Sequence, residues 1–249
     1  MKINEQIFLI TGGAGFFGEF LCGYFLDQGA KKVILTDIDQ VRLQSIKSKF
    51  TEVETFVCDL SDNIAVKDCV NQITANNKIS VLINNAGWIH SEPLINLLNK
   101  DKPQHSFENW DKAIKLNLYS CFNITSYVAA FMVKNRTRGV IINISSIAAQ
   151  GNLGQTAYSA AKAGIEAMTK TWSKELGPFK IRTAAIAPGF INTPSTQTSL
   201  SEQVLDKWKK QIPLGMLGEL ECIGNTAKFI IENDYVSGKV IAVDGGLTI

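Results

Sequence analysis

The stretch Thr11-Gly12-Gly13-Ala14-Gly15-Phe16-Phe17-Gly18 decides the fold, because it joins an apolar run, Ile7–Ile10, to a helical pattern that continues to about Gln28. Glycines at such a junction permit a tight turn, close approach of the backbone to a diphosphate, and close packing of helix on strand. The free N–H groups and the positive dipole end of the helix then face the phosphates. The stretch predicts a dinucleotide-binding unit that uses Gly12, Gly15, Phe17 and Gly18. A glycine-rich turn without function is the alternative.

Short apolar runs alternate with longer helical patterns along the rest of the chain. The further runs are Val33–Thr36, Val53–Cys58, Val81–Ile83, Val140–Ile144, Ile181–Ile186 and Val240–Val243. The helical patterns occupy residues 39–50, 62–76, 107–135, 156–176 and 219–232. Strands that are apolar throughout and separated by helices indicate a parallel sheet covered on both faces. We therefore expect an α/β fold with one Rossmann-like domain over residues 1–249: a doubly wound parallel sheet of about seven strands.

Composition narrows the class of protein. Lys and Arg number 25 and Asp and Glu 23, a net charge of +2, which argues against nucleic acid as the main partner. The dense cluster Lys207-Trp208-Lys209-Lys210 is interpreted as a solvated helix face. No apolar run approaches the roughly 18 residues of a membrane span, and the N-terminus is too polar for a signal peptide. The 5 cysteines are scattered without a CxxC pair, so we expect reduced thiols, no metal site and a cytoplasmic protein.

Asp37 lies 19 residues beyond Gly18, at the end of the second predicted strand. A carboxylate there can accept hydrogen bonds from both ribose hydroxyls of NAD and would repel the 2′-phosphate of NADP. The alternative is a turn or helix-capping residue, although Asp39 suits an N-cap better. The sequence therefore predicts NAD as the cofactor.

Tyr158 and Lys162 lie four residues apart in a predicted helix, so both side chains share one helix face. A nearby ammonium favours the phenolate, and we expect it to lower the pKa of Tyr158 toward neutrality. Polar residues also follow the predicted strands, and the carboxyl ends of parallel strands meet at one edge of the sheet. These residues are Asn84-Asn85-Ala86-Gly87, Asn143-Ile144-Ser145-Ser146, Pro188-Gly189 and Thr193, with Asn117 in the helix before the fifth strand.

Together these motifs resemble the classical-type short-chain dehydrogenase/reductase family over essentially the whole chain. Within it, the chain is most similar to type-2 3-hydroxyacyl-CoA dehydrogenases. Three stretches carry the narrower resemblance: Leu97-Leu98-Asn99-Lys100, Arg138-Gly139-Val140-Ile141-Ile142-Asn143, and Ile230-Ile231-Glu232-Asn233 running on to Gly238-Lys239-Val240-Ile241.

The resemblance implies roles for individual residues. Tyr158 would exchange a proton with the substrate oxygen, and Ser146 would orient that oxygen. Lys162 would hold the nicotinamide ribose, and Asn117 would hold a water behind it. The remaining cofactor contacts would come from Asn85, Ala86 and Gly87 on the adenosine side, Asp59 and Leu60 at the adenine, and Gly189, Ile191 and Thr193 near the carboxamide. The resemblance also implies a homo-oligomer, with a tetramer favoured, and a small-molecule substrate.

The chain departs from the family pattern at three places. Phe16 stands where the classical pattern has its middle glycine, so the spacing is closer to that of the extended branch. The interval to Tyr158 is one residue short and would select Ser145, whereas the Asn-x-Ser-Ser motif selects Ser146. Asp37 comes one residue later than in similar proteins.

Two polar stretches follow strand ends, Trp88–Ser106 and Thr193–Ser201, and each is either a substrate loop or a plain surface loop. His90, His105 and Cys121 are interpreted as loop or packing residues. The leading hypothesis is NAD(H)-dependent interconversion of a secondary alcohol and a ketone, with a 3-hydroxyacyl-CoA type of substrate. The alternatives are a 3-oxoacyl-carrier-protein reductase, a sugar or steroid dehydrogenase, and a catalytically silent nucleotide-binding scaffold.

Overall fold

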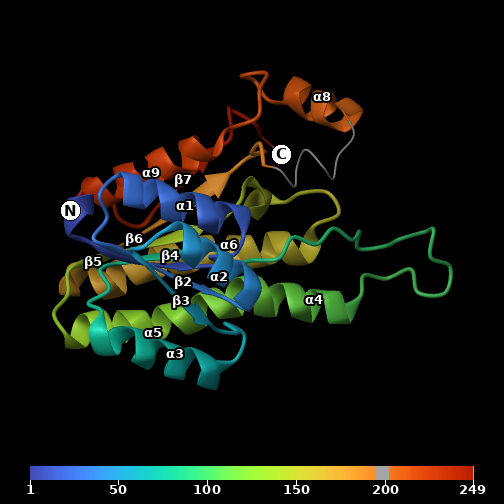
Figure 1. Cartoon of the computed structure of the whole chain (residues 1–249). Coiled ribbons are helices and arrows are strands. Elements are labelled where there is room, and N and C mark those ends of the chain that lie inside the picture. Colours follow the sequence, from blue (N-terminus) through green and yellow to red (C-terminus); the bar gives the residue numbers. More distant parts are fainter. Residues whose placement is uncertain (194–201, 249) are drawn as a thin grey trace.

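A computed structural model describes residues 1–193 and 202–248. Seven parallel strands form one sheet in the order β3-β2-β1-β4-β5-β6-β7, with helices on both faces (Figure 1). The strands are β1 (Ile7–Thr11), β2 (Lys32–Asp37), β3 (Val53–Val57), β4 (Val81–Asn84), β5 (Gly139–Ile144), β6 (Ile181–Pro188) and β7 (Lys239–Val243). The helices are α1 (Phe16–Asp27), α2 (Gln40–Lys49), α3 (Asn63–Asn76), α4 (Phe107–Ala113), α5 (Ser120–Lys134), α6 (Thr156–Leu176), α8 (Glu202–Gln211) and α9 (Leu220–Glu232). Shorter helical turns are η1 (Ile3–Glu5), η2 (Ile114–Tyr119), η3 (Ile147–Gln150) and η4 (Gly177–Phe179). The expected doubly wound, Rossmann-like sheet is confirmed.

The pleat of the sheet divides the core into two clusters. Phe8 and Ile10 of β1 face α1, α2 and α9, whereas Leu9 faces α3 and α5. All three side chains are fully buried. Successive strand residues point to opposite faces, so a strand covered on both sides must be apolar at every position. This requirement explains the unbroken apolar runs in the sequence.

Capping residues determine where several helices begin. Asp39 accepts a hydrogen bond from Arg42 N at 3.0 Å, as its predicted N-cap role requires. Ser106 accepts one from Asn109 N at 3.2 Å at the start of α4. Such side chains satisfy N–H groups that the first helical turn leaves without a backbone partner.

The helix predicted over residues 107–135 is present as one continuous helical segment made of α4, the π-helical turn η2 and α5. By length and composition the segment Phe107–Lys134 could cross a membrane, although no continuous apolar run in the sequence predicts one. Half of its apolar window is buried inside the protein, as in the core helix of a folded domain.

The carboxyl ends of the strands carry the longer connections. The segment between β4 and α4 extends as an arm beyond the helices (Figure 1). It corresponds to the polar stretch Trp88–Ser106, which we call the insert. The second stretch, Thr193–Ser201, lies outside the described residues except for Thr193. Helix α8 was expected only as the setting of the basic cluster at residues 207–210.

Candidate active site

The glycine turn brings β1, α1 and the end of β4 into close contact. Gly12 has φ +64°, and a Cβ there would lie 2.8 Å from the Cα of Ala86. A Cβ on Gly18 would lie 2.2 Å from the carbonyl oxygen of Gly12. Larger residues at either position would force the elements apart. Gly15 is the N-cap of α1 and contributes no side chain, so the first N–H groups of the helix remain available to an anion.

The end of β4 is fastened to the turn by Asn85. Its Nδ2 donates to the carbonyl oxygens of Thr11 and Gly12 at 3.0 and 3.1 Å. The Thr11 hydroxyl accepts hydrogen bonds from the backbone N–H groups of Asn85 and Ala86 at 3.0 and 3.1 Å. The Asn85–Gly87 segment is therefore built into the same structure as the glycine turn.

Asp37 lies at the carboxyl end of β2, beside the glycine turn. Its Oδ2 accepts a hydrogen bond from Ala14 N at 3.0 Å, and its Oδ1 accepts one from Asp39 N at 3.1 Å. Asp59 and Leu60, which are predicted to contact the adenine, follow the end of β3. Asp59 accepts a hydrogen bond from Ser61 N at 2.8 Å, and its hydrogen bonds with Ser61 lower its pKa. Leu60 is buried, and its carbonyl accepts from Asn123 Nδ2 at 3.0 Å.

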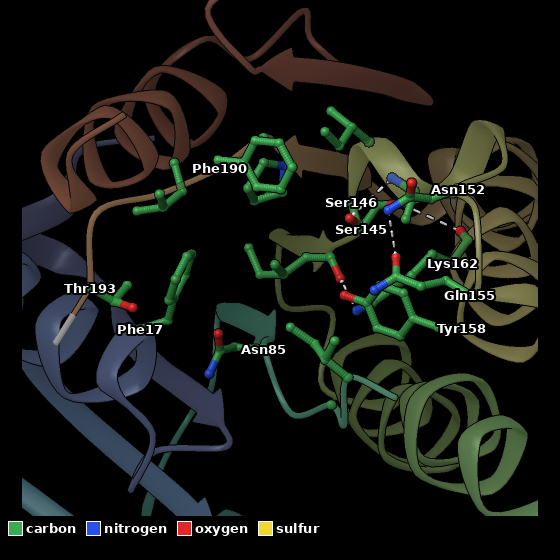
Figure 2. Close-up of a pocket in the computed structure, with 18 of the residues that line it drawn as sticks. Phe17, Asn85, Ser145, Ser146, Asn152, Gln155, Tyr158, Lys162, Phe190 and Thr193 are labelled. Atoms are coloured by element: carbon green, nitrogen blue, oxygen red, sulfur yellow. Dashed lines mark hydrogen bonds between the residues drawn. The ribbon is translucent and has the colours of Figure 1, made fainter. Parts of the chain in front are cut away.

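A cavity of about 520 Å³ opens at the carboxyl edge of the sheet (Figure 2). It collects predicted residues from α1, from α6 and from the segments that follow β4, β5 and β6: Phe17, Asn85, Gly87, Ser146, Tyr158, Lys162, Gly189, Ile191 and Thr193. The other predicted residues do not line it: Gly12, Gly15, Gly18, Asp37, Asp59, Leu60, Ala86 and Asn117. Most of these support the glycine turn or lie toward the β2 side of the sheet.

Burial dominates the electrostatics of Tyr158 and Lys162. It raises the pKa of Tyr158 to about 12, and a hydrogen bond with Ser146 opposes this rise only in part. Burial also lowers the pKa of Lys162 to about 8. The Lys162 ammonium donates to the carbonyl oxygen of Ile144 at 2.7 Å and lies 5.6 Å from the centre of the Tyr158 ring. The expectation that Lys162 lowers the pKa of Tyr158 was therefore wrong for this arrangement, because burial disfavours the charged phenolate and raises that pKa, and Lys162 is not among the groups that shift it.

The two adjacent serines have different partners. Ser146 hydrogen bonds with Tyr158, and its Oγ also accepts from Ala148 N at 3.1 Å. The Ser145 hydroxyl donates to Glu166 Oε1 at 2.9 Å. Both serines line the cavity, but only Ser146 interacts with the Tyr158 side chain among the contacts of the described residues.

Asn117 is fully buried in the π-helical turn η2. Its Oδ1 accepts from Trp88 N at 3.0 Å, and its Nδ2 donates to the carbonyl oxygens of Trp88 and Ala113, both at 2.9 Å. A Cβ on Gly87 would lie 2.7 Å from Asn117 Oδ1 and 3.6 Å from Lys162 Nζ. Asn117 and Lys162 are thus neighbours across Gly87, and the Asn117 amide fixes the start of the insert.

One wall of the cavity is aromatic, which no sequence motif predicts. Phe190 and Trp208 stack with ring centroids 4.0 Å apart and an interplanar angle of 11°. Trp208 belongs to the basic cluster that was interpreted as a solvated helix face, and for this side chain the interpretation was wrong. A single tryptophan among lysines was the available signal, since an amphipathic helix turns its apolar residue inward. Asn152 and Gln155, which also line the cavity, carried no recognisable motif.

The base of the insert is held by Glu92. Its carboxylate binds His90 Nε2 at 3.1 Å, Ser106 N at 3.0 Å and Asn109 Nδ2 at 3.0 Å. These hydrogen bonds, with Asn109 the largest contributor, lower the pKa of Glu92 to about 2. Glu92 N also donates to the carbonyl oxygen of Gly154 at 2.6 Å. The insert is therefore joined to the turn that precedes Tyr158.

Comparisons with known proteins agree with this geometry. A family model described as enoyl-(acyl carrier protein) reductase matches residues 18–248. The chain is 37% identical over 257 residues to a 3-oxoacyl-[acyl-carrier-protein] reductase of Thermotoga maritima, covering 100% of both chains. It is 38% identical over 262 residues to the human (3R)-3-hydroxyacyl-CoA dehydrogenase, covering 99% of this chain and 97% of that protein. A solved structure of a 7α-hydroxysteroid dehydrogenase complexed with NADH and 7-oxo glycochenodeoxycholic acid superposes with a TM-score of 0.88 at 27% identity, covering 99% of this chain and 96% of the other.

The chain therefore belongs to the short-chain dehydrogenase/reductase family and is an oxidoreductase that acts on CH–OH groups. Within the family its relatives include both 3-oxoacyl-carrier-protein reductases and 3-hydroxyacyl-CoA dehydrogenases.

Proposed function

We propose that the protein interconverts a secondary alcohol and a ketone with NAD(H), and that its substrate is a 3-hydroxyacyl thioester of the coenzyme A type. The observation that carries the proposal is the meeting of Tyr158, Ser146 and Lys162 at one cavity. The similarity to the human (3R)-3-hydroxyacyl-CoA dehydrogenase supports the choice of substrate.

Tyr158 acts as the acid/base. Because its pKa is raised to about 12, its hydroxyl is protonated at neutral pH and can donate a proton to a ketone oxygen. Ser146 hydrogen bonds with Tyr158 and can orient the same oxygen. Lys162 presents a buried cation beside Gly87 for the nicotinamide ribose, and Asn117, on the other side of Gly87, would hold a water of a proton relay.

The residues present fit a nicotinamide dinucleotide. The glycine turn leaves no room for side chains at Gly12 and Gly18, and α1 begins without a side-chain cap. Asp37 would accept hydrogen bonds from the adenosine ribose, which favours NAD over NADP. Asp59 and Leu60 would contact the adenine, Asn85 and Ala86 the adenosine side, and Gly189, Ile191 and Thr193 the carboxamide. When bound, the cofactor supplies or accepts the hydride.

A 3-oxoacyl-carrier-protein reductase is the second candidate, and the similarity to the Thermotoga maritima protein favours it. That reading predicts a preference for NADPH, which the Asp37 carboxylate disfavours. A steroid substrate is a further alternative, supported by the structural similarity to the 7α-hydroxysteroid dehydrogenase.

The decisive experiment follows NADH absorbance during incubation with acetoacetyl-CoA, in parallel with NADPH and with the Tyr158→Phe variant. We expect NADH to be consumed by the native protein and not by the variant, which should still bind NADH. An active Tyr158→Phe variant would refute the acid/base role. Tight NADH binding without consumption would exclude this substrate and turn the search to sugars and steroids.

We also propose a homo-oligomer, with a tetramer favoured, that works in the cytoplasm on a small molecule. A groove of about 500 Å³ runs between α5 and α6 and is lined by Phe122, Ala129, Ala130, Val133, Trp172 and Leu176 among others. Small and apolar side chains on two adjacent helices suit close helix packing against a second copy. The near-neutral charge supports the absence of nucleic acid from its partners.

A further inference from the structure

Phe16 occupies an exposed position at the first turn of α1. Its side chain remains 40% exposed and lines the cavity, although the family pattern has a glycine here. Arg42, in the first turn of α2, holds its guanidinium carbon 5.2 Å from the centre of the Phe16 ring. A guanidinium at this distance over an aromatic face is attracted by the ring quadrupole. Phe16 thus places a cation beside the glycine turn.

The guanidinium of Arg42 is otherwise only weakly held. Within residues 1–193 and 202–248, its one ion pair joins Nη2 to Glu19 Oε2 at 3.6 Å. Glu19 has a shorter ion pair with Lys49, at 2.5 Å. The Arg42 side chain is 42% exposed. The five N–H donors of its planar fork are therefore largely free to meet an oxyanion.

Among the described residues that line the cavity, Lys162 is the one cation, and its ammonium is engaged with Ile144 at the Tyr158 end. The N–H groups at the start of α1 supply only a partial positive charge. A dinucleotide, however, carries a diphosphate with two negative charges.

We propose that Arg42 is a phosphate-binding residue for the dinucleotide cofactor and that Phe16 is the platform on which its guanidinium rests. The inference rests on the proposed function, because it assumes a dinucleotide at the glycine turn. From its place over the Phe16 ring, the planar guanidinium of Arg42 would make a bidentate contact with two phosphate oxygens, which a lysine cannot make. The phosphate is either the diphosphate, common to NADH and NADPH, or the 2′-phosphate that only NADPH carries.

The test compares dissociation constants by fluorescence titration of the full chain with NADH and with NADPH. We expect Arg42→Gln to weaken binding at least about tenfold, because the charge-assisted hydrogen bonds to the phosphate are lost. Lys49→Gln is the matched control, because it removes the same charge from the same helix and the same partner, Glu19. It should change the dissociation constants less than about twofold, since surface ion pairs contribute little. The melting temperatures without ligand should show that both variants are folded.

The outcomes separate the two proposals. An equal loss for NADH and NADPH supports contact with the diphosphate, and a loss confined to NADPH supports contact with the 2′-phosphate. Unchanged affinity of Arg42→Gln for both cofactors overturns the inference while leaving the proposed function intact. Failure of the native protein to bind either cofactor overturns both. Phe16→Leu, which removes the platform but keeps Arg42, should give a smaller loss than Arg42→Gln.

Discussion

Burial shifts the pKa values of Tyr158 and Lys162 in opposite directions, because it disfavours the charged form of each side chain. The pKa of Lys162 falls to about 8, and the pKa of Tyr158 rises to about 12. Both groups therefore remain close to their neutral forms in alkaline solution. At neutral pH the buried Lys162 ammonium is charged, and this lowers the free energy of unfolding. An anionic or hydroxyl-rich ligand that binds next to it can stabilise the charge.

This lower free energy of unfolding predicts a pH dependence of stability. Between pH 8 and 10 the unfolded chain binds more protons at Lys162 than the folded chain, so the free energy of unfolding rises with pH. From pH 7.5 to 9.5 we expect a gain of about 2 kcal/mol from this residue. Lys162→Met should lack it. Urea denaturation of both proteins at the two pH values measures the difference, and equal pH responses would contradict the prediction.

The two serines give a second prediction at this scale. Ser146→Ala should lower kcat by about 10²-fold, because its hydroxyl interacts with Tyr158 and orients the substrate oxygen. Ser145→Ala should lower it far less, because Ser145 donates to Glu166 instead. Steady-state kinetics with the same substrate compare the pair. A larger loss for Ser145→Ala would assign the catalytic role to the other hydroxyl.

The sequence was informative about which residues meet but not about their ionisation. The Tyr158–Lys162 spacing and the motif ending in Ser146 were enough to predict their proximity. The burial of the Tyr158 hydroxyl depends on elements distant in the chain, so the direction of its pKa shift could not be predicted. The solvated position expected for Trp208 was wrong for the same reason, since Phe190 comes from a different element.

Among the elements, the strands were predicted to within two residues at each end, because the five inner strands are apolar on both faces and the edge strands β3 and β7 still contain short apolar runs. The insert could not be predicted in the same way. Its backbone follows neither the helical nor the strand period, and its base is organised by the side chain of Glu92. A carboxylate that accepts hydrogen bonds from both ends of a loop leaves no periodic signal in the sequence.

Removal of Glu92 should release the insert. In Glu92→Ala, Asn109 and Ser106 lose their acceptor, and we expect the free energy of unfolding to fall by about 1–3 kcal/mol. Faster cleavage within the insert should accompany this loss in limited proteolysis followed by mass spectrometry. Glu108→Ala, at an exposed position in α4, is the control and should cleave at the native rate.

For the whole molecule, we predict that the groove between α5 and α6 is the contact between copies of the chain in the homo-oligomer. Phe122 is 49% exposed on this face, so Phe122→Glu should leave the fold intact but place a charge in the contact between copies. We expect a smaller species in size-exclusion chromatography with light scattering. Tyr235→Glu, at a site 99% exposed elsewhere on the surface, should keep the native mass. A native mass for Phe122→Glu would exclude this groove as the interface.

The order of the strands also bears on how the chain is made. β1 lies between β2 and β4, yet β2 ends at Asp37 and β4 ends at Asn84. During synthesis β1 can pair with β2 as soon as β2 has left the ribosome. Its other edge has no partner until β4 has been synthesised. At roughly 5–20 residues per second this interval lasts on the order of 2–9 seconds. For that interval the nascent chain presents an apolar strand with an open edge, the kind of edge through which strands of separate chains associate.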